Sequence, residues 1–123
     1  MKAIVIDDSR AIRSILGKMM KDLGFEVFEG SNGLEGLKVL EAQGALDVAL
    51  VDWNMPEMNG LEFVKAVRAE PKFGSMRIMM VTTETETSQM VAALEAGANE
   101  YVMKPFTKEV IGEKLGLMGV SKG

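Results

Sequence analysis

Short apolar runs alternate with longer segments of helical period along the whole chain, and this alternation restricts the fold more than any other feature. The runs that indicate buried strands span residues 2–6, 25–29, 46–52, 77–82 and 99–103. The third run is apolar almost throughout, which is typical of a parallel strand covered on both faces. The intervening segments carry apolar residues at helical spacing. Five such strand–helix units predict one doubly wound α/β domain over residues 1–123.

Capping residues mark where the expected helices begin. Ser9 is placed to cap a first helix with an apolar face of Ile12, Ile15, Leu16, Met19 and Leu23. Asn32 starts the second helix, with Glu35 positioned to complete a capping box, and Asn59 starts the third. A fourth helix through Met90, Val91 and Leu94 ends at Gly97, and Thr107 caps the last.

Composition excludes several kinds of chemistry. The chain has no Cys and no His, so thiolate zinc sites, a Cys nucleophile and a Ser-His-Asp triad are impossible. Any bound metal must be a hard cation held by oxygen. A net charge of -4 argues against a nucleic-acid partner held by a basic face. The first apolar run is too short for a signal peptide or a membrane span, so we expect a cytoplasmic protein that does not bind membranes.

Functional side chains follow four of the five expected strands. Asp7 and Asp8 follow the first, Asp52 with Trp53-Asn54-Met55-Pro56 ends the third, Thr82-Thr83-Glu84 ends the fourth, and Lys104-Pro105 follows the fifth. The second ends in Glu29-Gly30-Ser31, which carries no functional signal. Right-handed crossovers place the carboxyl ends of parallel strands on one edge of the sheet, where ligands bind.

Three aspartates, a hydroxyl and one ammonium group are therefore expected to converge. Neighbouring carboxylates repel one another unless a proton or a cation intervenes, and Asp7, Asp8 and Asp52 form a natural Mg²⁺ site. Carboxylates also serve as nucleophiles that form aspartyl phosphates. The set therefore suits phosphoryl transfer. Taken alone, Asp7-Asp8 is more typical of a charged helix entry, and only the combined set favours a metal site.

These residues give the chain a resemblance to receiver domains of two-component response regulators, most closely the single-domain chemotaxis type. The resemblance covers essentially the whole chain and is carried by Asp7-Asp8, Asp52 to Pro56 with Gly60, Thr82, and Lys104-Pro105-Phe106. It implies a flavodoxin-like (βα)5 fold with a five-stranded parallel sheet of order 2-1-3-4-5.

The resemblance also implies a role for each site residue. Asp52 is the phosphoacceptor, and Asp7, Asp8, Asp52 and the Asn54 backbone carbonyl hold Mg²⁺. Thr82 binds the phosphoryl group and Tyr101 swings inward with it as a switch. Lys104 contacts the acyl phosphate, and the Lys104–Pro105 peptide is cis. Thr83 departs from the family pattern, which usually has a smaller residue there, and its bulk could narrow access to the phosphate.

The resemblance implies a monomeric signalling switch rather than an enzyme acting on free substrates. A sensor histidine kinase would supply the phosphate. The output partner, for the chemotaxis type a flagellar motor switch, would bind the face formed by the fourth helix, fifth strand and fifth helix. A phosphorelay intermediate stays open as an alternative. A small aspartyl-phosphate phosphatase or an FMN protein fits less well, because the former usually places its nucleophile after the first strand and the acids of Asp7-Asp8 repel a phosphate.

Overall fold

The computed structural model describes residues 1–83 and 87–120, and within them five parallel strands form one sheet. The strands are β1 (Lys2–Ile6), β2 (Glu26–Gly30), β3 (Val48–Val51), β4 (Arg77–Thr82) and β5 (Glu100–Met103). Their order is β2-β1-β3-β4-β5, and each neighbouring pair is parallel. The predicted flavodoxin-like fold class is confirmed.

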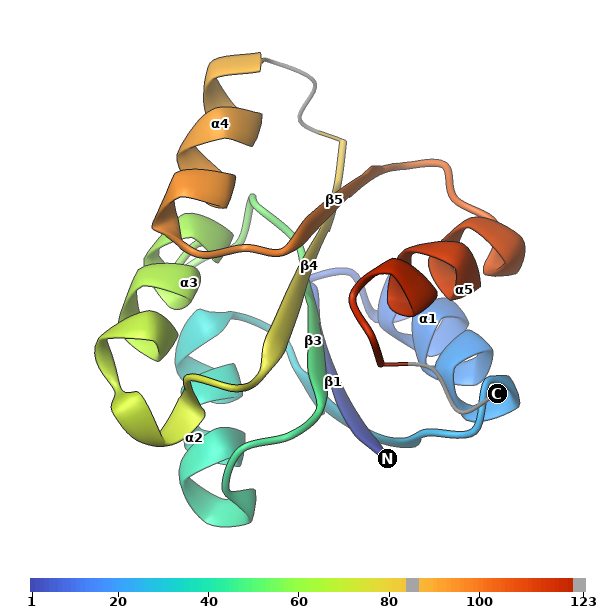
Figure 1. Cartoon of the computed structure of the whole chain (residues 1–123), viewed down its shortest axis with the longest axis horizontal. Coiled ribbons are helices and arrows are strands. Elements are labelled where there is room, and N and C mark those ends of the chain that lie inside the picture. The colour runs from blue at the N-terminus through green and yellow to red at the C-terminus, as the bar shows by residue number, and fades with distance from the viewer. Residues whose placement is uncertain (84–86, 121–123) are drawn as a thin grey trace.

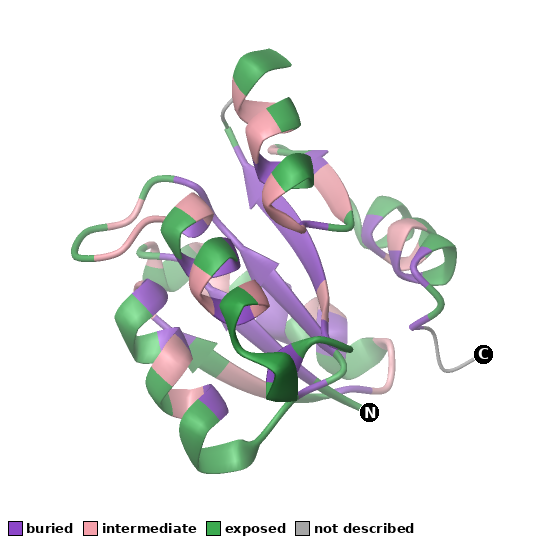
Figure 2. Cartoon of the chain, turned by 60° about the vertical axis from the view of Figure 1, so that its left-hand side comes forward, coloured by how far each residue is buried: buried purple, intermediate pink, exposed green. Residues whose placement is uncertain are grey.

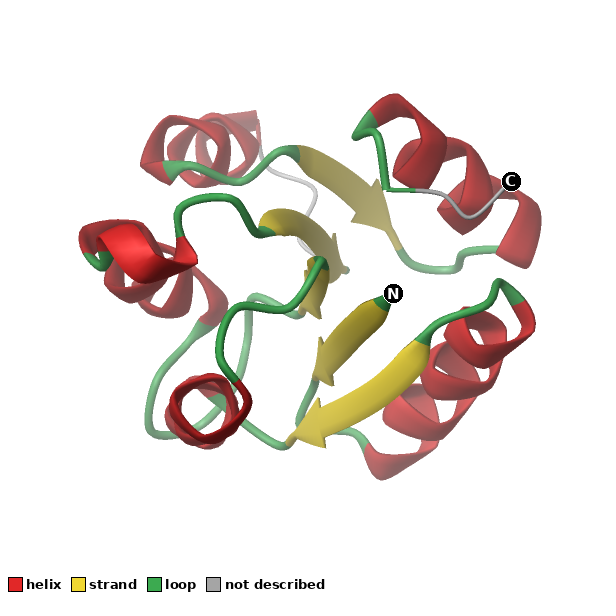
Figure 3. Ribbon diagram, turned by 60° about the horizontal axis from the view of Figure 1, so that its bottom comes forward, coloured by secondary structure: helices red, strands yellow, loops and turns green. Residues whose placement is uncertain are grey.

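Helices cover both faces of the sheet. They are α1 (Arg10–Asp22), α2 (Gly33–Gln43), α3 (Gly60–Ala69), α4 (Thr87–Ala96) and α5 (Lys108–Leu117), with a short 3-10 turn η1 (Pro71–Phe73). Figure 1 shows α2, α3 and α4 on one side of the sheet and α1 and α5 on the other. Figure 3 shows the strands between these two helical layers.

Each strand contributes alternate side chains to two separate cores. Ile4 and Ile6 of β1 pack with Phe63 of α3, whereas Ala3 and Val5 pack with Leu16 of α1. Strand β3 is buried along its whole length, and β1 and β4 are buried at every residue but the first (Figure 2, purple). Because both faces are covered, β3 needs no polar positions, which explains its uninterrupted apolar sequence.

The boundaries of three strands differ from the prediction by one or two residues. The most shortened strand is β3, which was expected over residues 46–52 and spans Val48–Val51. Backbone pairing nevertheless continues past both ends. The N–H of Asp47 donates to the carbonyl of Lys2 at 2.9 Å, and the N–H of Asp52 donates to that of Ile6 at 2.9 Å. Asp52 therefore stays fixed beside β1 although it lies outside the regular strand.

The buried face of α1 is rotated from the predicted one. Leu16, Gly17 and Met20 are buried, whereas Ile15 is 47% exposed. Gly17 lies against Val27 of β2, so the helix approaches the sheet through its smallest residue. Ile15, two residues away, is turned by about 200° around the helix axis. Ile15, predicted to lie on the apolar face of this helix, is therefore outside the buried core.

Helix caps follow the sequence signals at most positions. The Ser9 and Thr107 hydroxyls accept hydrogen bonds from the N–H groups of Ile12 and Val110, and Asn59 forms a full capping box with Glu62. Of the two hydrogen bonds in the capping box predicted at α2, one is present and the other is not. Asn32 accepts from the Glu35 N–H, but the Glu35 carboxylate accepts from the N–H and hydroxyl of Ser31, at 2.7 Å and 2.6 Å.

Two further observations concern the described residues only. None of their helices is both long enough and apolar enough to cross a membrane. Glu84, named above with Thr82 and Thr83, lies outside the described residues.

Candidate metal centre

Three carboxylates meet at the carboxyl edge of the sheet. The Asp7 N–H donates to the carbonyl of Gly30 at 3.1 Å, which extends the pairing of β1 with β2 by one residue. Asp52 is fixed beside the end of β1 in the same way. Asp7, Asp8 and Asp52 each place one carboxylate oxygen within 4.8 Å of the others. Asp7 is 1% exposed and Asp52 7% exposed, whereas Asp8 faces solvent. The predicted convergence of these carboxylates is confirmed.

One cation lies against this cluster. Lys104 follows β5, and its Nζ lies 2.9 Å from Asp7 Oδ2 and 3.6 Å from Asp52 Oδ2. The Lys104 side chain is only 15% exposed. Its backbone N–H donates to the carbonyl of Thr82 at 2.9 Å, and the Lys104–Pro105 peptide bond is cis, the geometry that the resemblance implies. One ammonium group thus faces two buried carboxylates.

The balance of charges leaves Asp52 reluctant to ionise. Burial raises the pKa of the Asp52 carboxyl above its ordinary range, and the nearby Asp7 carboxylate raises it further. Lys104 and hydrogen bonds from Thr82 and the Trp53 N–H lower it, but less strongly. Lys104 alone therefore does not balance the negative charge of the ionised carboxylates, and a further cation would be stabilised there. The carboxylate oxygens are hard ligands of the kind that Mg²⁺ prefers.

The start of α3 fixes the backbone beneath Asp52. The N–H of Gly60 donates to the carbonyl of Trp53 at 2.9 Å. A methyl group at position 60 would overlap the Asp52 carbonyl oxygen, so only glycine allows this approach. Gly60 was singled out in the sequence because it accompanies the Asp52 motif, and the structure supplies the steric reason.

The other predicted site residues surround the cluster. Thr82 is buried at the end of β4, and its side chain hydrogen-bonds Asp52. Asn54 is exposed in the loop after Asp52, and Trp53 is 9% exposed beside it. Tyr101 lies further back on β5, half-buried against the core on the α3 and α4 side. The structure thus brings all but Tyr101 to the sheet edge.

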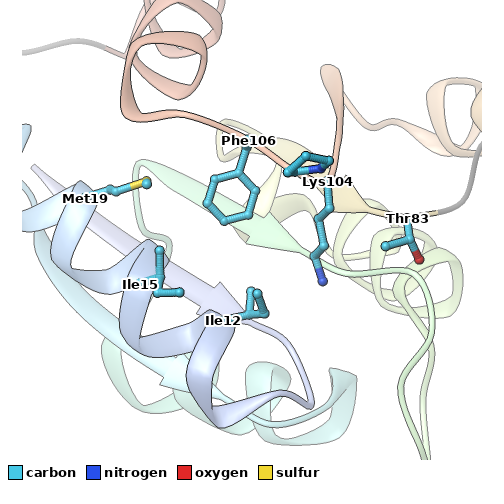
Figure 4. A pocket seen from close by; sticks show the side chains of 7 residues that line it. Ile12, Ile15, Met19, Thr83, Lys104 and Phe106 are labelled. Atoms are coloured by element: carbon cyan, nitrogen blue, oxygen red, sulfur yellow. The ribbon is translucent and has the colours of Figure 1, made fainter.

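An apolar pocket of about 380 Å³ opens beside Lys104. Ile12, Ile15 and Met19 of α1 form one wall, and Phe106 faces them from the other side (Figure 4). Pro105 also lines the pocket. Thr83, at the end of β4, completes the lining. The exposed Ile15 thus belongs to a concave surface next to the acidic cluster.

Two charged residues near the site were missed in the sequence. The Arg13 guanidinium of α1 donates to the Asp7 backbone carbonyl at 2.7 Å and to Glu29 at 3.2 Å. Glu29 is the penultimate residue of β2, the strand that carried no functional signal. Its proximity to Arg13 depends on how α1 packs against β2, and no motif in either segment indicates it.

A doubly wound α/β domain with three acidic residues and a lysine at its carboxyl edge defines a class of signalling proteins. Residues 3–116 match the family model of the response regulator receiver domain, and the chain belongs to this family.

Individual relatives narrow the class further. The chain is 46% identical to chemotaxis protein CheY1 of Helicobacter pylori strain J99, over 94% of each protein. It is also 46% identical to the chemotaxis protein CheY homolog of Campylobacter jejuni strain 81-176, over 100% of this chain and 96% of that protein. Chemotaxis protein CheY4 of Vibrio cholerae superimposes with a TM-score of 0.89 at 35% identity, over 95% of this chain and 97% of that one. The protein is a phosphorylation-dependent signalling switch homologous to the chemotaxis regulators.

Proposed function

We propose that Asp52 accepts a phosphoryl group from a sensor histidine kinase in the cytoplasm. The observation that carries this proposal is a buried carboxylate with a raised pKa, which lies within 4.8 Å of the carboxylate oxygens of two other aspartates and 3.6 Å from a lysine ammonium. A phosphoryl group would add negative charge to a site that already holds three carboxyl groups. The site can hold that group only when cations balance the charge.

Mg²⁺ is the cation that fits the donor set. Asp7, Asp8 and Asp52 supply three carboxylates within reach of one ion. By the family resemblance, the backbone carbonyl of Asn54 would supply a fourth oxygen. When bound, the ion neutralises the carboxylates and the developing charge on the phosphoryl oxygens. Mg²⁺ binding should therefore be required for phosphorylation.

The transfer is a substitution at phosphorus. An Asp52 carboxylate oxygen attacks the phosphorus of a phosphohistidine while the phosphorus–nitrogen bond breaks, and the electron pair of that bond stays on the donor imidazole. The chain has no His, so the donor must be another molecule. Lys104, already beside Asp52, contacts the transferred group, and Thr82 donates its hydroxyl to a phosphoryl oxygen.

Phosphorylation would alter the surface through Thr82 and Tyr101. The phosphoryl group draws in the Thr82 hydroxyl at the end of β4, and Tyr101 turns into the space released. The responsive surface comprises α4, β5 and α5. It carries exposed apolar side chains on all three elements, namely Val91, Leu94, Met103 and Val110. An output protein in chemotaxis, the flagellar motor switch, binds this surface of the monomeric receiver.

Phosphotransfer to Asp52 tests the proposal. We expect labelling by a phosphorylated kinase domain or a small acyl phosphate, and its loss both in EDTA and in Asp52→Asn. Asp47→Asn serves as a matched control, because Asp47 is an exposed aspartate just before β3, at the end of the strand away from the site. Undiminished labelling of Asp52→Asn would exclude Asp52 as the acceptor.

A second experiment separates chemotaxis output from a phosphorelay. The receiver carrying beryllofluoride and Mg²⁺ is mixed with a motor-switch peptide, and the phosphorylated receiver is mixed with a histidine phosphotransfer domain. We expect tighter binding of the peptide and no rapid transfer of phosphate to the domain. The reverse result would favour the phosphorelay.

A further inference from the structure

Arg13 contacts the backbone of the residues that would bind the metal. It is the fourth residue of α1, and its side chain is only 17% exposed. Nη1 donates to the Asp7 backbone carbonyl at 2.7 Å, and Nε donates to Glu29 at 3.2 Å. A hydrogen bond from a guanidinium is stronger than one between neutral groups, and its planar fork sets direction as well as distance.

The contacted carbonyl belongs to the peptide unit that joins the two acidic residues. Asp7 and Asp8 are consecutive, so the angle between their carboxylates depends on the backbone rotations on either side of this peptide. The Asp7 N–H is already held by Gly30, and the Asp7 carboxylate accepts from the Ser9 N–H at 2.8 Å. The bond from Arg13 fixes the remaining polar group of Asp7.

From this geometry we propose that Arg13 is a positioning residue for Mg²⁺ binding, held in place by Glu29. It fixes the Asp7–Asp8 peptide so that both carboxylates face the same ion. Glu29 orients the guanidinium and offsets its charge, which would otherwise oppose the binding of a cation nearby. This inference rests on the proposed function, since it assumes that Asp7 and Asp8 hold Mg²⁺.

Positioning and simple charge predict opposite results when the guanidinium is removed. Arg13→Met deletes a positive charge near the site, which on charge alone should tighten Mg²⁺ binding. If Arg13 positions the loop, the same change should weaken Mg²⁺ binding by about tenfold, the range found when groups supporting metal ligands are lost. The sign of the change in Kd therefore decides between the two.

The test is calorimetric titration of Mg²⁺ into the full chain, with the fluorescence of Trp53 as a second signal. Lys18→Met is the matched control, because Lys18 is exposed on the same helix and its loss removes the same charge. Arg13→Lys keeps the charge but cannot supply the fork, and it should weaken binding by about threefold, between wild type and Arg13→Met.

The inference is overturned if either Arg13 variant binds Mg²⁺ as tightly as the wild type or more tightly. If Arg13→Met fails to fold, Arg13→Lys alone decides. If the wild-type chain itself binds no Mg²⁺, the proposed function fails, which is a different outcome from unchanged affinity in the variants.

Discussion

At the scale of single residues, burial of the proposed phosphoacceptor Asp52 beside Asp7 lowers the stability of the unphosphorylated protein. Asp52 is buried next to Asp7, and its raised pKa shows that the folded protein resists its ionisation. The hydrogen bonds from Thr82 and the Trp53 N–H only partly offset burial and repulsion. A cation bound beside Asp52 should therefore favour its ionised form and stabilise the folded protein.

Asp52→Asn should therefore stabilise the metal-free protein by about 1–2 kcal/mol at neutral pH. The folded-state pKa of Asp52 lies above the ordinary value of 3.8, so between these two pKa values the folded state keeps a proton that the unfolded state has lost. Wild-type stability then falls as pH rises through the folded-state pKa. Urea unfolding in EDTA should show that the variant has the larger free energy of unfolding. This difference from the wild type should be absent below about pH 3.8 and increase as the pH rises towards neutrality.

Saturating Mg²⁺ serves as the control for this comparison. It should stabilise the wild type, by about 1.4 kcal/mol at ten times Kd, and stabilise the variant less. A variant that is less stable than the wild type in EDTA at neutral pH would contradict this account of Asp52.

The bulk of Thr83 should lengthen the lifetime of the phosphorylated state. Thr83 is exposed, follows the Asp52-bonded Thr82 directly, and lines the pocket that opens beside Lys104. Thr83→Ala should speed dephosphorylation by about two- to fivefold, which corresponds to less than about 1 kcal/mol in the barrier.

Thr83→Val separates the bulk of this side chain from its hydroxyl. Valine keeps the branched shape, so it should retain the wild-type lifetime, measured by loss of label after the donor is removed. Equal lifetimes for Thr83→Ala and wild type would rule out the steric explanation.

At the scale of elements, Arg68 of α3 contacts the segments that precede β4 and β5, at the edge of the sheet opposite the carboxylates. From α3 it donates to the carbonyl of Gly97 at 3.0 Å, just after α4, and to that of Gly74 at 3.2 Å. It also donates to the Asn99 side chain at 3.0 Å, and Asn99 Oδ1 in turn accepts from the Ile78 N–H at 2.8 Å. The end of α4 and the start of β5 are thereby fixed together, although both border the proposed output surface.

Arg68→Met should destabilise the fold by about 2–3 kcal/mol, because several carbonyls lose a charged donor. Arg68→Lys should recover only a small part of this, since one ammonium cannot reach all the acceptors. Urea unfolding measures both, with Lys65→Met, an exposed lysine of the same helix, as the control. A loss below about 0.5 kcal/mol for Arg68→Met, the range of ordinary surface substitutions, would contradict this role.

At the scale of the whole molecule, sequence periodicity predicted the fold because the pattern of every element is local. Both ends of β1 and β4 were predicted correctly, and Ser9, Asn59 and Thr107 cap their helices as expected. The convergence of Asp7, Asp8 and Asp52 was predictable because parallel topology brings the strand ends together.

Contacts between elements were not predictable in the same way. The exposure of Ile15 depends on how far α1 rotates to bring Gly17 against β2. The bond of Arg13 to Asp7 depends on the same packing, and Glu35 accepts from Ser31 rather than from the Asn32 N–H that the capping box requires. Side-chain partners of this kind are decided by tertiary distance, which residue spacing does not record.

The central claim is that Asp52, among all the acidic and hydroxyl residues of the chain, carries the phosphoryl group. The most direct test phosphorylates the protein in Mg²⁺, reduces it with borohydride, which converts an aspartyl phosphate to homoserine, and maps the product by peptide mass spectrometry. The account predicts homoserine at position 52 and unmodified Asp7 and Asp8. Homoserine at another aspartate, or a phosphate that survives reduction on Thr82 or Thr83, would contradict it.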